Sequence, residues 1–158
     1  MKVNELRIGN YIRQVKTHNG FDWDKIRTIA AINKEGYLSV NVLEVGEIGL
    51  TLSKLKIDKF VPIHLTEEWL VRLGFKLIGE RNEVVNDYES NEAIFRKGEG
   101  GQCMVKFVKE WYGSTEDKPE RYIQFYWYDD SLISIQHVHQ LQNLYFALTG
   151  EELTIKPI

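Results

Sequence analysis

The chain has 158 residues, of which 43% are hydrophobic and 27% are charged, and its formal net charge is −3. This composition is typical of a globular protein and excludes a mainly disordered chain. A general nucleic-acid binder usually carries a surplus of Lys and Arg, which is missing here, although a local basic patch remains compatible with the charge count.

Cysteine usage and hydropathy point to a cytoplasmic protein. The single cysteine, Cys103, cannot form an internal disulfide, so nothing favours an oxidising compartment. The N-terminus lacks the apolar run of a signal peptide, and no stretch approaches the ~20 apolar residues that span a bilayer. We therefore expect no membrane partner.

The first sixty residues predict short β-strands. Residues 26–32 are rich in β-branched side chains, residues 33–36 form a turn signal, and residues 37–45 alternate apolar and polar positions. A last strand is expected within 57–63. This spacing predicts a small SH3-like β-barrel or a curved sheet, and other small barrels would give the same pattern.

A short helix is predicted at residues 67–73. Thr66 is a suitable N-cap, and Glu67 and Glu68 suit the positive end of the helix dipole. Gly74 is placed to end the helix in the left-handed conformation.

Residues 75–138 predict an antiparallel sheet. Strands are expected at 75–78, 93–97 and 132–138, and a long hairpin at 103–112 and 121–128, whereas the polar segment 80–92 is expected to include a loop or an irregular segment. A C-terminal helix should begin near His139 and end at Gly150, because Leu141, Leu144 and Leu148 follow helical spacing. The expected fold is α+β, with a domain at 1–63 packed against a second at 64–158.

The hairpin strand 121–128 carries a dense set of tyrosines. Tyr122, Gln124, Tyr126 and Tyr128 share one face of a regular strand. Tyrosine combines a flat apolar ring with a polar tip, so this face is a candidate binding surface for protein or nucleic acid. The competing interpretation is that a helix or the first domain covers these tyrosines, which is common in sheets.

Two histidines form a candidate metal site. On one strand, His137 and His139 would point to the same face, with Asp129 and Asp130 as further candidate ligands for zinc or a similar ion. A helix that begins near His139 would break this geometry. Structural roles for both histidines are the alternative, and we favour them.

No catalytic residue is assigned and no cofactor is expected. Cys103 lies in no catalytic motif and is interpreted as a buried structural thiol. The glycines at 98–101 lack the lysine and the following helix of a phosphate loop, so they predict a hairpin turn. Adjacent acidic pairs do not establish two carboxylates across a cleft.

Three segments resemble an uncharacterised family that is widespread in Bacteroidetes genomes and in their phages and prophages. They are ELRIGNY at 5–11, PIHLTEEWLVRLGF at 62–75 and VHQLQNLYFALTGEEL at 138–153, whereas about 76–135 carries none of the resemblance. The family has no established activity, so the resemblance implies no functional residue. It implies a bacterial cytoplasm and a connection with mobile elements.

These observations lead to three functional hypotheses. The leading one is a non-enzymatic binding or adaptor module that engages a protein partner, with nucleic acid as the other possible partner. The second is a small metal-dependent enzyme built around His137 and His139. The third is a structural component of an assembly such as a phage particle.

Overall fold

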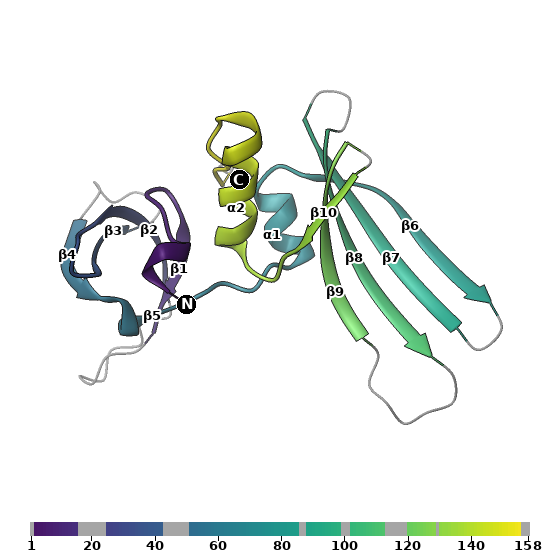
Figure 1. The fold of residues 1–158 in the computed structure, drawn as a ribbon, viewed down its shortest axis with the longest axis horizontal. Coiled ribbons are helices and arrows are strands. Elements are labelled where there is room, and N and C mark those ends of the chain that lie inside the picture. The colour runs from purple at the N-terminus through teal and green to yellow at the C-terminus, as the bar shows by residue number, and fades with distance from the viewer. Residues whose placement is uncertain are drawn as a thin grey trace. The chain divides into compact units, whose positions relative to one another are not determined.

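The computed structural model describes residues 2–15, 25–42, 51–85, 88–98, 102–112, 120–128 and 130–155. It is an α+β fold with two five-stranded antiparallel sheets (Figure 1). The chain divides into two compact units: residues 1–64 with 137–152, and residues 65–136 with 153–158. Each unit has its own sheet, and the C-terminal helix groups with the N-terminal sheet.

The first unit contains a sheet in the order β4-β3-β2-β1-β5. Its elements are η1 (Val3–Glu5), β1 (Tyr11–Gln14), β2 (Lys25–Ile32), β3 (Tyr37–Val42), β4 (Thr51–Lys56), η2 (Ile57–Lys59) and β5 (Phe60–Val61). Every neighbouring pair of strands is antiparallel. The predicted strand 26–32 and the turn at 33–36 are confirmed. The predicted strand 37–45 is confirmed over residues 37–42, and residues 43–45 lie outside the described residues. The start of the predicted strand 57–63 is a 3-10 helix.

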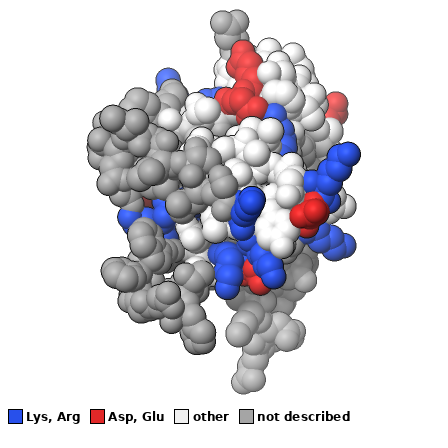
Figure 2. All heavy atoms as spheres, turned by 90° about the vertical axis from the view of Figure 1, so that its left-hand side faces the viewer, with Lys and Arg blue, Asp and Glu red and all other residues white. Residues whose placement is uncertain are grey.

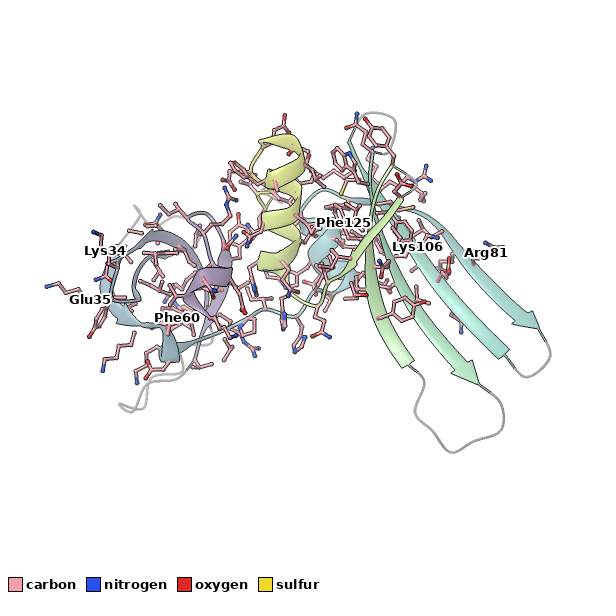
Figure 3. The ribbon with its side chains drawn as sticks, viewed as in Figure 1. Lys34, Glu35, Phe60, Arg81, Lys106 and Phe125 are labelled. Carbon is pink, nitrogen blue, oxygen red and sulfur yellow. The ribbon has the colours of Figure 1, made fainter. Side chains whose placement is uncertain are left out.

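The inner face of this sheet holds the core of the first unit. Six buried residues pack together there, namely Leu6, Ile12, Ile29, Leu38, Val40 and Phe60. Leu38 and Val40 occupy alternate positions along β3 and therefore share this face, because successive strand residues point to opposite faces. Figure 3 labels Phe60 among these side chains.

The described residues of the first sheet do not close a barrel. Sequence analysis gave a small β-barrel or a curved sheet as the two expectations for this region, and the closed barrel is corrected. β5 has two residues and pairs with β1, and no register joins it to β4. The 3-10 helix η2 carries the chain from one edge of the sheet to the other. A two-residue strand offers too few backbone groups to complete a second ladder.

The helix α2 (Val138–Thr149) belongs to the first unit. It buries one face through Val138, Leu141 and Tyr145. Gly150 ends it with φ of 75°, and its N–H donates to the Phe146 carbonyl, as predicted for a glycine that ends a helix. Val138 N–H donates to the Ile63 carbonyl, which ties the start of α2 to the end of the first sheet.

The second unit contains a sheet in the order β10-β9-β8-β7-β6 and the helix α1 (Glu67–Arg72). The strands are β6 (Lys76–Val85), β7 (Tyr88–Lys97), β8 (Cys103–Tyr112), β9 (Glu120–Trp127) and β10 (Asp130–Ser134). The Thr66 side chain caps α1 by accepting from the Trp69 N–H, and Gly74 follows with φ of 84°. The predicted helix, its cap and the long hairpin are therefore confirmed.

The second unit departs from two expectations. Of the segment 80–92, expected to include a loop or an irregular segment, residues 80–85 and 88–92 belong to β6 and β7, two paired ten-residue strands, and residues 86–87 lie outside the described residues. The strand expected at 132–138 is displaced, since β10 ends at Ser134 and α2 begins at Val138. Of the glycine turn at 98–101, only Gly98 lies within the described residues, with φ of 96°.

Candidate functional site

The two faces of the second sheet differ in what covers them. Phe95, Val105 and Phe125 are at most 2% exposed and occupy one face at registered positions. Lys97 lies on that same face, and its Nζ donates to the Leu73 carbonyl at 2.9 Å, which places the end of α1 against it. Figure 3 shows Phe125 on the α1 side of the sheet and Lys106 on the other.

We call the opposite side the open face of the second sheet. Strand register places on it Lys76, Arg81, Glu92, Ile94, Arg96, Met104, Lys106, Val108, Tyr122, Gln124, Tyr126, Ser131 and Ser134. Three residues of the predicted tyrosine surface, Tyr122, Gln124 and Tyr126, are thus brought together on β9.

Side-chain contacts tie the polar groups of the open face to one another. Lys106 Nζ lies 4.8 Å from the centre of the Tyr126 ring and 3.6 Å from Glu92 Oε2. Gln124 Nε2 donates to Ser131 Oγ at 2.6 Å, and Ser134 Oγ donates to Gln124 Oε1 at 2.8 Å. Hydrogen bonds on both sides of one amide fix its orientation, so the face presents a defined polar pattern.

Exposure separates the tyrosines of this region. Tyr122 is 37% exposed and Tyr126 is half-buried. Tyr128 is not on the strand face: β9 ends at Trp127, and Tyr128 lies in the following turn, 56% exposed, with φ of 53°. The sequence alternation continues to Tyr128, but the strand itself ends one residue earlier, at Trp127. Tyr128 was therefore grouped with the strand residues incorrectly.

The candidate metal ligands fall in different units. His137 and His139 belong to the first unit and Asp130 to the second, while Asp129 lies outside the described residues. His137 pairs with His64 through a β-bridge, and its ring stacks on that of His139 at 5.5 Å between centroids. Among the described residues, no three His, Cys, Asp or Glu side chains converge in a group that could hold a metal.

Burial determines the protonation of these histidines. His139 is 2% exposed, and burial followed by repulsion from His137 lowers its pKa to about 4. Burial and repulsion from His64 also lower the pKa of His137, against an opposing hydrogen bond with Gln140. Both imidazoles are therefore neutral at pH 7.

Cys103 is a buried thiol, as predicted. It is 1% exposed, and burial raises its pKa to about 12, against a smaller opposing effect of Lys97. The thiolate is the nucleophilic form of cysteine, and at neutral pH this side chain stays protonated.

Sequence analysis missed a ladder of polar contacts that holds α2 to the start of the chain. Gln142 Oε1 accepts from the Tyr11 N–H at 2.8 Å, and Gln142 Nε2 donates to the Gly9 carbonyl at 3.1 Å. Asn143 Oδ1 accepts from Asn10 Nδ2 at 2.9 Å. These residues come from two of the segments behind the family resemblance, where they act as scaffold.

An ion pair extends this ladder. Both guanidinium ends of Arg7 donate to the Glu152 carboxylate, at 2.6 and 3.1 Å, and the Arg7 guanidinium lies 3.7 Å from the Phe146 ring centre. Arg7 and Glu152 are 145 positions apart, so no local pattern predicts their pairing. The only sequence signal for it was that the segments 5–11 and 138–153 occur together in the family resemblance.

Comparison of the chain with protein-family models, curated proteins and solved structures finds no match. Neither helix of the described residues is long and apolar enough to cross a membrane. The functional assignment therefore depends on the geometry and chemistry of the surfaces.

Proposed function

We propose that this protein is a non-enzymatic binding module whose open face on the second sheet engages a protein partner. One observation carries the proposal: Tyr122 and Tyr126 lie on the sheet face opposite α1, beside an oriented amide and two hydroxyls. Tyrosines with nearby amide and hydroxyl groups are the chemistry that protein interfaces favour.

The charges of the open face support a protein partner more than a phosphate backbone. Lys106 is paired with Glu92. Arg81 also has an interaction partner within the protein. Cations that are already engaged release few counterions on binding, so they add little affinity for a polyanion.

Three finer assignments accompany this proposal. The order of the first sheet and the 3-10 helix before its last strand support an SH3-like arrangement. The three resembling segments support membership of the Bacteroidetes and phage family. The single buried cysteine supports a reducing, cytoplasmic setting.

Affinity capture from a lysate of the native host tests the proposed surface. Tyr122→Ala removes an exposed ring from the open face, and Tyr128→Asn removes an exposed ring from the adjacent turn as a matched control. The expected result is a partner captured by the wild type and by Tyr128→Asn, with capture by Tyr122→Ala reduced about tenfold or more, as for a residue central to an interface.

Retention of that partner by Tyr122→Ala, in a sample whose circular dichroism matches the wild type, would show that the open face is not the binding surface. Nuclease treatment of a parallel sample separates direct protein capture from capture through nucleic acid. Loss of the partner on nuclease treatment would also contradict the proposal.

A further inference from the structure

The first unit has a shallow pocket of about 240 Å³ beside the β2–β3 turn. Its lining residues are Glu35, Gly36, Tyr37, Lys56, Ile57 and Asp58. Tyr37 and Lys56 are directly paired across β3 and β4, so their side chains leave the same face of the sheet. The pocket thus combines one aromatic ring, one ammonium and two carboxylates.

The turn that forms one wall of this pocket is held by hydrogen bonds. Asn33 Oδ1 accepts from the N–H groups of Glu35 and Tyr37, at 3.0 and 2.8 Å. Gly36 has φ of 82°, and a Cβ there would lie 3.3 Å from Val3 Cγ2. A larger residue is disfavoured by both conformation and space, so the position of Tyr37 is well determined.

One exposed lysine lines the pocket, and three more lie within two residues of its lining residues in the sequence. They are Lys34 in the turn, Lys54 and Lys56 on β4, and Lys59 at the end of η2. In the described part of the chain, none of the four forms an ion pair or a hydrogen bond through its ammonium. Figure 2 shows Lys and Arg side chains gathered on this side of the molecule, with carboxylates among them.

Lys54 shows a further unusual feature. It has φ of 59° at an irregularity in the β3–β4 register, a left-handed conformation that costs a lysine energy. Strained backbone of this kind concentrates at ligand-binding positions. The bulge projects an unpaired ammonium two residues from the pocket lysine Lys56.

We infer that this basic surface binds single-stranded nucleic acid, with one base stacked on Tyr37. Tyrosine rings are stacking platforms for unpaired bases, and unpaired lysines bind the phosphates that follow and precede such a base. The Glu35 and Asp58 carboxylates can accept hydrogen bonds from the amino group of a base. Lysines on three segments, the β2–β3 turn, β4 and η2, fit several phosphates, which favours a strand over a mononucleotide.

The pocket carboxylates also suit a cationic side chain, as in a basic peptide. Two features disfavour that occupant: Lys56 lines the same pocket, and three further unpaired lysines lie within two residues of its lining residues in the sequence. A cation entering here meets four like charges against two carboxylates, whereas a nucleotide meets complementary groups at both its base and its phosphate.

Fluorescence anisotropy with a labelled single-stranded DNA of mixed sequence, about 15 nucleotides long, tests the inference on the full chain. Binding at low salt should weaken as NaCl is raised. Tyr37→Ala should reduce affinity about tenfold, while Tyr37→Phe, which keeps the ring, should retain it. The triple variant Lys34→Gln, Lys54→Gln, Lys56→Gln should reduce the salt slope by about 2.

Lys76→Gln, an exposed lysine of the second unit, is the matched control and should bind as the wild type does. No binding at low salt would overturn the inference, as would equal affinity of the wild type and Tyr37→Ala. Stronger binding of a basic peptide than of DNA would also overturn it.

If a mononucleotide at equal concentration displaced the DNA completely, the inference that the ligand is a nucleic-acid strand would be contradicted. Tyr122→Ala should leave DNA binding unchanged, which separates this test from that of the open face.

Discussion

Tyr128 adopts a backbone conformation that its side chain does not favour. Its φ of 53° lies in the left-handed region, in the turn that follows Trp127, and Asn and Gly are the residues preferred in this conformation. Tyr128→Asn should therefore stabilise the protein by about 0.5–1 kcal/mol, since it relieves this strain while losing a mostly exposed ring. Urea denaturation of the purified variant measures the change.

Tyr122→Asn is the comparison for this prediction, because Tyr122 lies within a regular strand. Asparagine is a poor strand residue, so this variant should be less stable than the wild type. If both variants lose stability equally, strain at residue 128 is not the cause.

The buried His139 should make stability depend on pH. Its pKa is about 4 in the folded protein, against an ordinary value of 6.5, so the unfolded chain binds the proton more readily. The contribution of neutral His139 to the free energy of unfolding is complete above pH 6.5 and is lost as the pH falls towards 4. His137 lowers this pKa and Glu5 raises it.

Urea denaturation at two pH values measures this effect. Between about pH 7.5 and 5, His139 should account for a loss of about 2 kcal/mol in the free energy of unfolding. His139→Gln should remove most of this pH dependence and leave the smaller part due to His137. An unchanged pH dependence in the variant would assign the effect to other groups.

At the scale of elements, α2 is held by an amide that both donates and accepts. Gln142 is 1% exposed and pairs with the backbone of Gly9 and Tyr11. Gln142→Ala leaves both backbone groups without this partner and removes buried volume, so it should destabilise the protein by about 3 kcal/mol. Thermal or urea denaturation measures the loss.

Gln140→Ala is the control on the same helix. Gln140 is exposed, and its side chain accepts from the His137 N–H at the helix start. Losing such a cap should cost about 1 kcal/mol or less. Similar losses for Gln140→Ala and Gln142→Ala would show that the buried ladder contributes no more than a cap.

Elements with local signals could be predicted from the sequence, whereas others could not. Thr66 and Gly74 delimit α1, and Gly150 ends α2, because caps and left-handed glycines act within a few residues. The pairing of β6 with β7 over residues 80–85 and 88–92 was not predicted, because these polar residues resemble a loop. Arg7 and Glu152 were missed because sequence periodicity carries no information about pairs 145 residues apart.

The candidate site was predictable only in part. The alternation of β9 correctly grouped Tyr122, Gln124 and Tyr126, but it also included Tyr128, which follows the end of the strand. The pocket at Tyr37 gave no linear signal, since Lys56 reaches it through cross-strand pairing. Such sites depend on register, which the sequence pattern alone does not determine.

At the scale of the whole molecule, the division into units predicts which fragments can fold. The first unit includes α2, whose Val138, Leu141 and Tyr145 are at most 6% exposed. A fragment of residues 1–63 lacks this helix and should not fold stably, because it exposes the surface that α2 covers in the first unit. Joining residues 1–64 to 137–152 by a Gly/Ser linker should restore folding.

Circular dichroism and amide NMR dispersion of both fragments check this prediction. A cooperatively folded 1–63 fragment would show that the N-terminal sheet is an independent domain with the boundary expected from the sequence. An unfolded linked fragment would show that the first unit depends on the second.

The central claim is that the open face of the second sheet is a protein-binding surface, and hydroxyl-radical footprinting of tyrosines in the full chain tests it most directly. Oxidation of Tyr122 and Tyr128 is compared by mass spectrometry with and without the captured partner. Both rings are exposed in the free protein, at 37% and 56%. The predicted result is protection of Tyr122 with Tyr128 unchanged. Protection of Tyr128 alone, or of neither ring in a saturated complex, would contradict the claim.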